Sequence, residues 1–188
     1  METILDTNVS DNKDRPVIYG TFRKRFGALF IDGLVLMPIT GLVMYNMFAW
    51  KSPFVLVFIS LISLVYKPLL EYKYGATLGK MAIKLTVVNT AYEKVNLAES
   101  LTRNVFAILL GIFSIITTLL LFNAPGFEDA TTFTGYSALS RASSLNTGYS
   151  IFAFTIYLVD CIFLWSDDRK RSLHDRIAST YVIEKVAP

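Results

Sequence analysis

The sequence has almost none of the residues that build disulfide frameworks or transition-metal sites. Among 188 residues there is one cysteine, Cys161, which cannot form an internal disulfide, and one histidine, His174. Charged residues are scarce as well, at 18%, and the formal net charge is only +3. These shortages exclude a disulfide-bonded scaffold and a zinc enzyme, and we expect no metal, no cofactor and no nucleic-acid partner.

Apolar residues take the place of the missing charges. The chain is 53% hydrophobic and 14% aromatic, with a mean hydropathy of +0.47, which exceeds the average for soluble domains. Four long apolar stretches carry the excess, at residues 26–50, 53–70, 105–122 and 149–165. The first would reach about 37 Å as a helix, more than the roughly 30 Å hydrocarbon core of a bilayer. The expected fold class is an all-α polytopic membrane protein with four transmembrane helices, and its first partner is the lipid bilayer.

Basic residues are distributed unevenly among the connections. Fifteen of the eighteen lie before the first stretch, between the second and third, or after the fourth, whereas Lys51 and Arg141 lie in the other two connections and Lys67 lies inside the second stretch. The positive-inside rule places the more basic side in the cytoplasm. We therefore expect a multi-pass protein of the cell (inner) membrane with both termini in the cytoplasm and residues 123–148 as an outside loop.

The two ends of the chain fit this topology. Residues 1–24 are polar and contain no short apolar run followed by small residues, which favours a cytoplasmic tail over a cleaved signal peptide. Residues 25–188 form the membrane domain, and residues 166–188 are its cytoplasmic tail.

The connection between the second and third stretches is patterned. Polar and apolar residues alternate over residues 81–88 and again over 180–186, as in half-buried strands, so we expect a small β element that joins the two segments. The alternative is an amphipathic segment on the membrane surface. Residues 96–103 should be helical and lead into the third span.

Three ionisable residues lie inside the apolar stretches. Each costs about 2.5 to 3.5 kcal/mol on insertion scales, so each calls for a partner. With the expected topology Asp32, Lys67 and Asp160 lie at similar depths near the cytoplasmic side, and they could share one polar site between helices. The polar residues expected to help at this site are Ser63, Tyr66, Glu71 and Tyr157.

Two interpretations of these charges remain open. They could form an ion-pair network that fixes helix register without a ligand, or they could mark a path for an ion or a proton. Arg25 lies two turns before Asp32 on the same helix face and would orient or neutralise it. Lys67 could also snorkel to the interface alone, or pair with Glu71 one turn away.

No enzyme motif accompanies these charges. The run GATLGK at residues 75–80 differs from a phosphate loop, because its glycines are one residue too close and no strand precedes it. No motif places a serine or cysteine nucleophile. We expect that the protein is not an enzyme.

Three motifs point to a known family. The run RFGALFID at residues 25–32 resembles the signature of RDD-family membrane proteins, with an arginine that opens the first span and an aspartate within it. The run at residues 75–80 is similar to the family's Gly-x-Thr-Leu-Gly-Lys element, and LHDRIAST at residues 173–180 resembles its closing Leu-His-Asp stretch. The resemblance covers residues 23 to about 185.

The resemblance implies that Arg25, Asp32 and Asp175 are the three residues for which the family is named. Two features depart from the shared pattern. Ser179 stands where the family usually has glycine, and the long outside loop with a fourth span is not part of the pattern. Asp160 lies outside the motifs. Ligand transport has been suggested for the family, and cation/proton exchange is attributed to some members.

The sequence therefore favours a membrane protein that transports or binds a cation, such as a monovalent one, or a small ligand. The site would be an intramembrane carboxylate, with Asp32 at its centre. The alternative function is a membrane scaffold or assembly factor in which Arg25, Asp32 and Asp175 are structural. Because four spans are few for a complete path, we expect a homo-oligomer, most simply a dimer.

Overall fold

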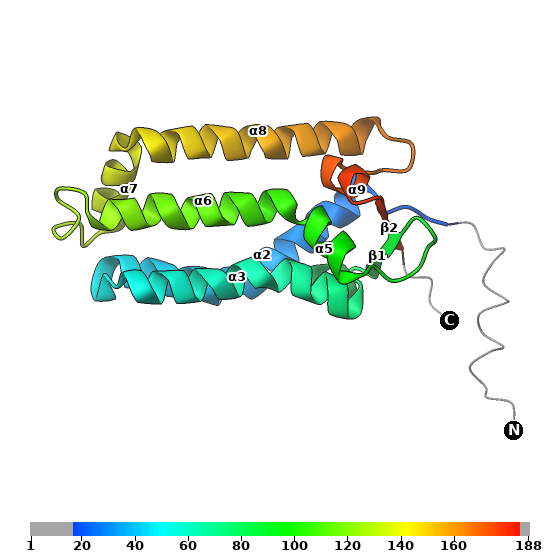
Figure 1. Cartoon of the computed structure of the whole chain (residues 1–188), viewed down its shortest axis with the longest axis horizontal. Helices are drawn as coiled ribbons and strands as arrows, with labels where there is room; N and C mark the ends of the chain where they lie inside the picture. The colour runs from blue at the N-terminus through cyan, green and yellow to red at the C-terminus, as the bar shows by residue number, and fades with distance from the viewer. Residues whose placement is uncertain (1–16, 185–188) are drawn as a thin grey trace, which may run out of the picture.

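Four long helices dominate the computed structural model, which describes residues 17–184 (Figure 1). The first runs through α2 (Phe22–Tyr45) into a π-helical turn, η1 (Asn46–Trp50). The other three are α3 (Pro53–Tyr74), α6 (Val105–Phe122) and α8 (Ser144–Ser166). Between and after them lie α4 (Leu78–Ala82), β1 (Leu85–Asn89), α5 (Leu97–Arg103), α7 (Phe133–Ala142), α9 (Leu173–Ile177) and β2 (Thr180–Glu184).

The four long helices are long and apolar enough to cross a membrane. Their most apolar windows have mean hydropathies between 1.6 and 2.7. The four predicted spans are confirmed as helices, although three of them have different bounds, and the first begins at Phe22 rather than at residue 26. Helix α3 continues past residue 70 to Tyr74, and α8 begins at Ser144, inside the predicted loop 123–148. That early start has a local cause, because the Ser143 hydroxyl caps the helix by accepting from the Asn146 amide.

The helices form an open bundle in which α6 is central. Helix α6 packs against α3 on one side and α8 on the other, and α2 crosses behind α3 and also contacts it (Figure 1). Large apolar side chains such as Phe54 and Phe154 are exposed on the outer faces of these helices. Apolar side chains on the outer surface are expected where the helices are surrounded by lipid rather than by water.

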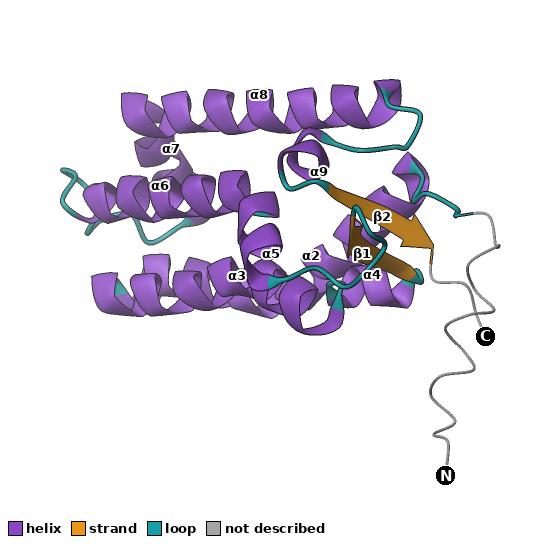
Figure 2. Cartoon of the chain, turned by 45° about the vertical axis from the view of Figure 1, so that its right-hand side comes forward, coloured by secondary structure: helices purple, strands orange, loops and turns teal. Residues whose placement is uncertain are grey.

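A two-stranded sheet lies at one end of the bundle (Figure 2). Strands β1 and β2 pair antiparallel, from Leu85 opposite Glu184 to Asn89 opposite Thr180, and Tyr19 adds a bridge to Ile183. The predicted small β element is therefore confirmed over the amphipathic alternative. The first strand begins later than its pattern indicated, because Met81 and Ala82 belong to α4.

Short helices complete this end, which we call the polar end and define by α4, α5, α9, β1 and β2. The helix expected at residues 96–103 is confirmed as α5. Asn96 and Glu99 form a capping box at its start, in which each side chain accepts a hydrogen bond from the other residue's backbone amide. At the opposite end of the bundle, the connection between α6 and α7 folds back, so that Phe127 packs with Met47, Leu56 and Leu121.

Candidate functional site

Asp32 is held by three neutral donors. Its carboxylate is only 3% exposed and accepts hydrogen bonds from the Tyr66 hydroxyl at 2.8 Å, the Thr77 hydroxyl at 2.6 Å and the Gly79 amide at 2.8 Å. Among the described residues 17–184, Asp32 forms no ion pair. Because its donors come from α3 and from the first turn of α4, the side chain ties these elements to α2.

The contact between α2 and α4 depends on small residues. A Cβ atom at Gly79 would collide with the carbonyl oxygen of Ala28 and lie 2.8 Å from Cγ of Asp32. Ala28 itself is 2% exposed. The backbone of α4 can therefore approach Asp32 closely enough to donate to it only because residue 79 is glycine.

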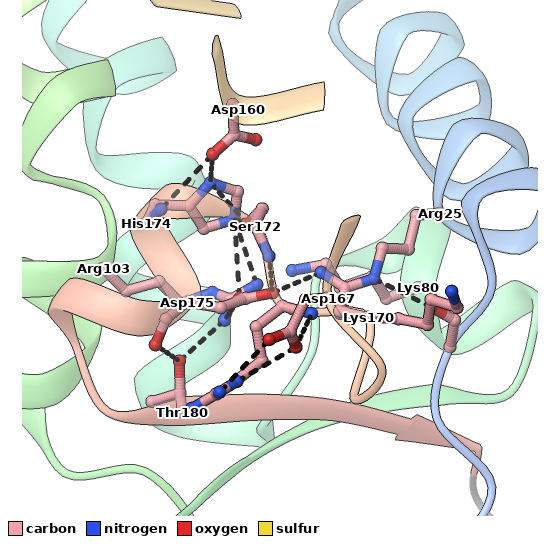
Figure 3. Close-up of polar contacts among 12 residues, drawn as sticks. Arg25, Lys80, Arg103, Asp160, Asp167, Lys170, Ser172, His174, Asp175 and Thr180 are labelled. Carbon is pink, nitrogen blue, oxygen red and sulfur yellow. Dashed lines mark hydrogen bonds and ion pairs between the residues drawn. The ribbon is translucent and has the colours of Figure 1, made fainter. Parts of the chain in front are cut away.

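Asp175 is the most deeply buried carboxylate of the polar end, with no exposed surface. One oxygen accepts from Nη1 of Arg25 at 2.5 Å and from the Ser172 amide at 3.1 Å, and the other pairs with Nη1 of Arg103 (Figure 3). Arg25 also donates to the carbonyl oxygen of Lys170. Asp175 thus joins α9 to both α2 and α5.

Arg103 extends this cluster to a second carboxylate. Its Nε lies 3.2 Å from Oε2 of Glu71. The Glu71 carboxylate also pairs with Lys80 and accepts a hydrogen bond from the side-chain amide of Asn104 at 2.9 Å. Charges of alternating sign therefore run through the polar end in the order Arg25, Asp175, Arg103, Glu71, Lys80. We call these five residues the charge network.

Electrostatics keep the network ionised. Burial alone would raise the pKa of the Asp175 carboxyl, but Arg103 and Arg25 hold it well below its usual range. Burial would lower the pKa of Arg103, whereas Asp175 and Glu71 raise it. Burial lowers the pKa of Lys80 to about 8 against the opposing effect of Glu71. The network is thus a set of paired charges at neutral pH.

Asp160 has a separate partner. Its carboxylate lies 2.7 Å from Nδ1 of His174 and accepts from the His174 backbone amide at 3.3 Å, so it links α8 to α9 (Figure 3). Nε2 of His174 in turn lies 3.4 Å from Nη2 of Arg103. The side chains of Asp160 and His174 are 22% and 30% exposed, so this pair is more accessible than Asp175 or Glu71.

The single polar site expected from Asp32, Lys67 and Asp160 does not form. No hydrogen bond or ion pair joins any two of them, because each carboxylate is occupied by other donors. Arg25 does not neutralise Asp32 either, since it points to Asp175. Glu71 pairs with Lys80 and Arg103 rather than with Lys67. Spacing along a helix indicates which residues share a face, but it does not indicate which residues of other elements they contact.

Lys67 instead lines a cavity between the spans. This space has a volume of about 400 Å³ and is bounded by α2, α3, α6 and α8. Two of the predicted helper residues, Ser63 and Tyr157, line it as well, whereas the other two, Tyr66 and Glu71, bind within the protein. The polar side chains around it are Thr40, Ser60, Ser63, Lys67, Asn104, Ser114, Tyr149 and Tyr157.

Sequence reasoning missed the roles of Arg103, Lys80 and His174. A signal for the first two existed, because a buried Glu71 at the end of a span requires a cation and both lie in the connection that follows. The spacing of Ser172 and Asp175 also matches a capping box, which predicts the start of α9. Within residues 17–184 no three His, Cys, Asp or Glu side chains cluster as metal ligands.

Comparison with known proteins agrees with the motifs. The model of the RDD family matches residues 19–179, which includes every element from the Tyr19 bridge to the end of α9. No curated protein and no solved structure matches the chain. The matched range includes Arg25, Asp32 and the Leu-His-Asp run at residues 173–175, whose contacts are described above. The chain belongs to the RDD family and is, with its four apolar helices, a membrane protein of that family.

Proposed function

We propose that this protein binds a small ligand inside the membrane and carries it between the two sides, with the cavity between the spans as its site. The observation that carries the proposal is a space of about 400 Å³, lined by polar side chains, among four apolar helices. Ligand sites in proteins usually have volumes of about 300–1,000 Å³. Polar residues inside a membrane bundle commonly mark the path of a substrate.

The polar residues that line the cavity come from several helices. On α3, Ser60, Ser63 and Lys67 follow at spacings of three and four, which places them on one helix face. Asn104 lies at the start of α6 and Ser114 lies within it, and Gly111 between them allows α3 to approach, since a Cβ there would collide with Leu64. Each of the four helices thus contributes at least one polar side chain to the lining of this space.

The charge network then has a supporting role in this proposal. It joins α2, α3, α5 and α9 at the polar end, and neither Asp32 nor Asp160 lines the cavity. The three family residues would hold the frame in which the helices surround the ligand. This changes the sequence hypothesis, in which Asp32 was the central ligand-binding group.

We further infer that the polar end faces the cytoplasm of a cell membrane. Fifteen basic residues on one side against Lys51 and Arg141 on the other support this orientation. The expected homo-oligomer and the absence of enzymatic activity stay predictions. The mass of the purified protein in a lipid nanodisc would test the dimer.

Proteoliposomes provide the test of the function. Gradients of Na⁺, of K⁺ and of a small organic anion are applied in turn, and flux is followed with internal ion or pH indicators. Ile115→Trp should fill the cavity and reduce any protein-dependent flux at least tenfold. Ile112→Trp is the matched control, because Ile112 lies on the same helix but is 43% exposed on its outer side. Flux that survives Ile115→Trp in folded protein would contradict the proposal.

Cation/proton exchange is a second candidate, and the pair of Asp160 and His174 favours it. A carboxylate within a span in contact with a partly exposed histidine is a means of binding and releasing a proton. The same proteoliposomes separate the candidates. Exchange through this pair would be lost in Asp160→Asn and retained in Ile115→Trp, whereas cavity transport would show the reverse.

The scaffold alternative rests on how completely the charge network is paired inside the chain. Such a network fixes helix register without needing a ligand. If no gradient produces flux, and variants of the network unfold the protein or release a partner, the scaffold is the better description.

A further inference from the structure

We propose that the ligand of the cavity is an organic anion, whose acidic group binds the Lys67 ammonium while its apolar body lies along the cavity wall. This inference rests on the proposed function and adds the chemical class of the ligand. It arises from the one charged side chain among the described residues that line the cavity, which is a cation.

Lys67 is the single charged residue that lines the cavity. Within residues 17–184 its ammonium forms no ion pair and no hydrogen bond, although Glu71 is only one turn away on the same helix. Glu71 is already held by Lys80, Arg103 and Asn104. An ammonium within an apolar bundle is costly without a counter-charge, and an anion in the cavity would supply it.

Hydroxyl groups around the cavity are also available to a ligand. The side chains of Ser60, Ser63, Ser114, Tyr149 and Tyr157 line the space, and none of them donates a hydrogen bond to another described residue. Hydroxyl donors and an ammonium together form the usual surroundings of a carboxylate, sulfonate or phosphate group. No aspartate or glutamate lines the cavity, so nothing there would bind a cation by charge.

The remaining wall is apolar. Leu36, Ile39, Val43, Leu64 and Ile115 also line the space. A small inorganic anion would leave these side chains without a partner, whereas a molecule with an acidic head and several carbon atoms would contact both parts. This division of the wall points to an amphiphilic anion rather than to chloride or free phosphate.

Three probes with the same six-carbon chain isolate the effect of charge. They are hexanesulfonate, hexyltrimethylammonium and 1-hexanol, and their binding to the full-length protein in lipid nanodiscs is measured by calorimetry, with empty nanodiscs as the blank. The wild type should bind hexanesulfonate at least tenfold more tightly than the other two. A charge-assisted hydrogen bond is strong enough to account for that factor.

Substitutions at Lys67 then test whether its positive charge causes the preference for the anion. Lys67→Met should weaken hexanesulfonate binding at least tenfold and leave 1-hexanol unchanged, and Lys67→Arg should retain most of the affinity for the anion. Lys73→Met is the matched control, because Lys73 lies on α3 but does not line the cavity. Retained binding of 1-hexanol by Lys67→Met also shows that the variant is folded.

Three results would overturn the inference, and the first two differ in what they say about the function. If all three probes bind equally, and Ile115→Trp abolishes their binding, the cavity is a ligand site but the choice of an anion is wrong. If none of the probes binds and Ile115→Trp changes nothing, both the inference and the proposed ligand site fail. Equal loss of anion binding in Lys67→Met and Lys73→Met would show that Lys67 acts only through general surface charge.

Discussion

Ser179 occupies a position whose backbone favours glycine. Its φ angle is +52°, in the left-handed region, and its side chain is exposed. A side chain there costs roughly 1–2 kcal/mol relative to right-handed geometry, because Cβ crowds the backbone. The residue that departs from the family pattern is therefore also a point of strain, at the turn between α9 and β2.

Replacing Ser179 by glycine should stabilise the protein. We expect Ser179→Gly to raise the free energy of unfolding by about 1 kcal/mol, because glycine adopts positive φ without a Cβ clash. Thermal unfolding in detergent micelles would measure the change. Ser179→Ala is the control, since it removes the hydroxyl but keeps Cβ; a gain in the alanine variant equal to that in the glycine variant would contradict the explanation.

The three residues that name the family act through different partners. Arg25 and Asp175 bind each other, whereas Asp32 binds Tyr66, Thr77 and Gly79. Arginine and aspartate two turns apart on one helix suggest a pair in the sequence. In the folded chain the two residues contact different segments. Arg25 binds Asp175 of α9, whereas Asp32 binds residues of α3 and of the start of α4.

Among the elements, the contact of α4 with α2 tolerates the least change. A Cβ at residue 79 would meet backbone, at the carbonyl oxygen of Ala28, and backbone cannot move aside as a flexible side chain can. The contact also carries a buried carboxylate, so its separation would leave Asp32 without the Gly79 donor.

Gly79→Ala should therefore destabilise the protein by about 1–3 kcal/mol, the usual range for overpacking a tight contact. Unfolding of the purified variant in detergent, followed by its intrinsic fluorescence, would measure this. The matched control is Gly33→Ala on α2, where an added Cβ meets nothing within 4 Å and alanine favours the helix. Equal losses in both variants would contradict the explanation, because alanine at residue 33 meets no neighbour and should stabilise its helix.

The spans and the capped helix α5 were predictable because their signals are local. Apolar runs of the right length indicate the spans, and Asn96 with Glu99 specifies the start of α5. The sheet was predictable as alternation in two segments. The charge network was not, because Arg103 and Asp175 lie 72 residues apart in sequence and meet only through the packing of α5 against α9.

Across the whole molecule, carboxylates at the polar end make stability depend on pH. Arg171 lowers the pKa of Asp167 from 3.8 to about 2, and Arg103 and Arg25 lower that of Asp175 further against the effect of burial. A group whose pKa is lower in the folded state stabilises the protein fully above its unfolded pKa. That contribution is lost as protons bind.

We therefore expect the free energy of unfolding to be nearly constant between about pH 5 and pH 7 and to fall between about pH 4 and pH 2. Chemical unfolding at a series of pH values would measure the slope. Asp167→Asn should make the slope shallower. Asp168→Asn, at an exposed aspartate of the same turn, should leave the slope unchanged; a slope that is identical in all three proteins would assign the acid sensitivity to other groups.

The pairing of β1 with β2 also has a consequence for the order in which the chain is completed during synthesis. Arg25, Arg103 and β1 emerge from the ribosome before α6 and α8, whereas Asp175 and β2 emerge after all four long helices. Until then Arg25 and Arg103 lack their shared anion and one strand lacks its neighbour. The polar end can therefore close only after all four long helices have been made, and a chain that stopped after α8 would leave Arg25 without its carboxylate partner and β1 without its neighbouring strand.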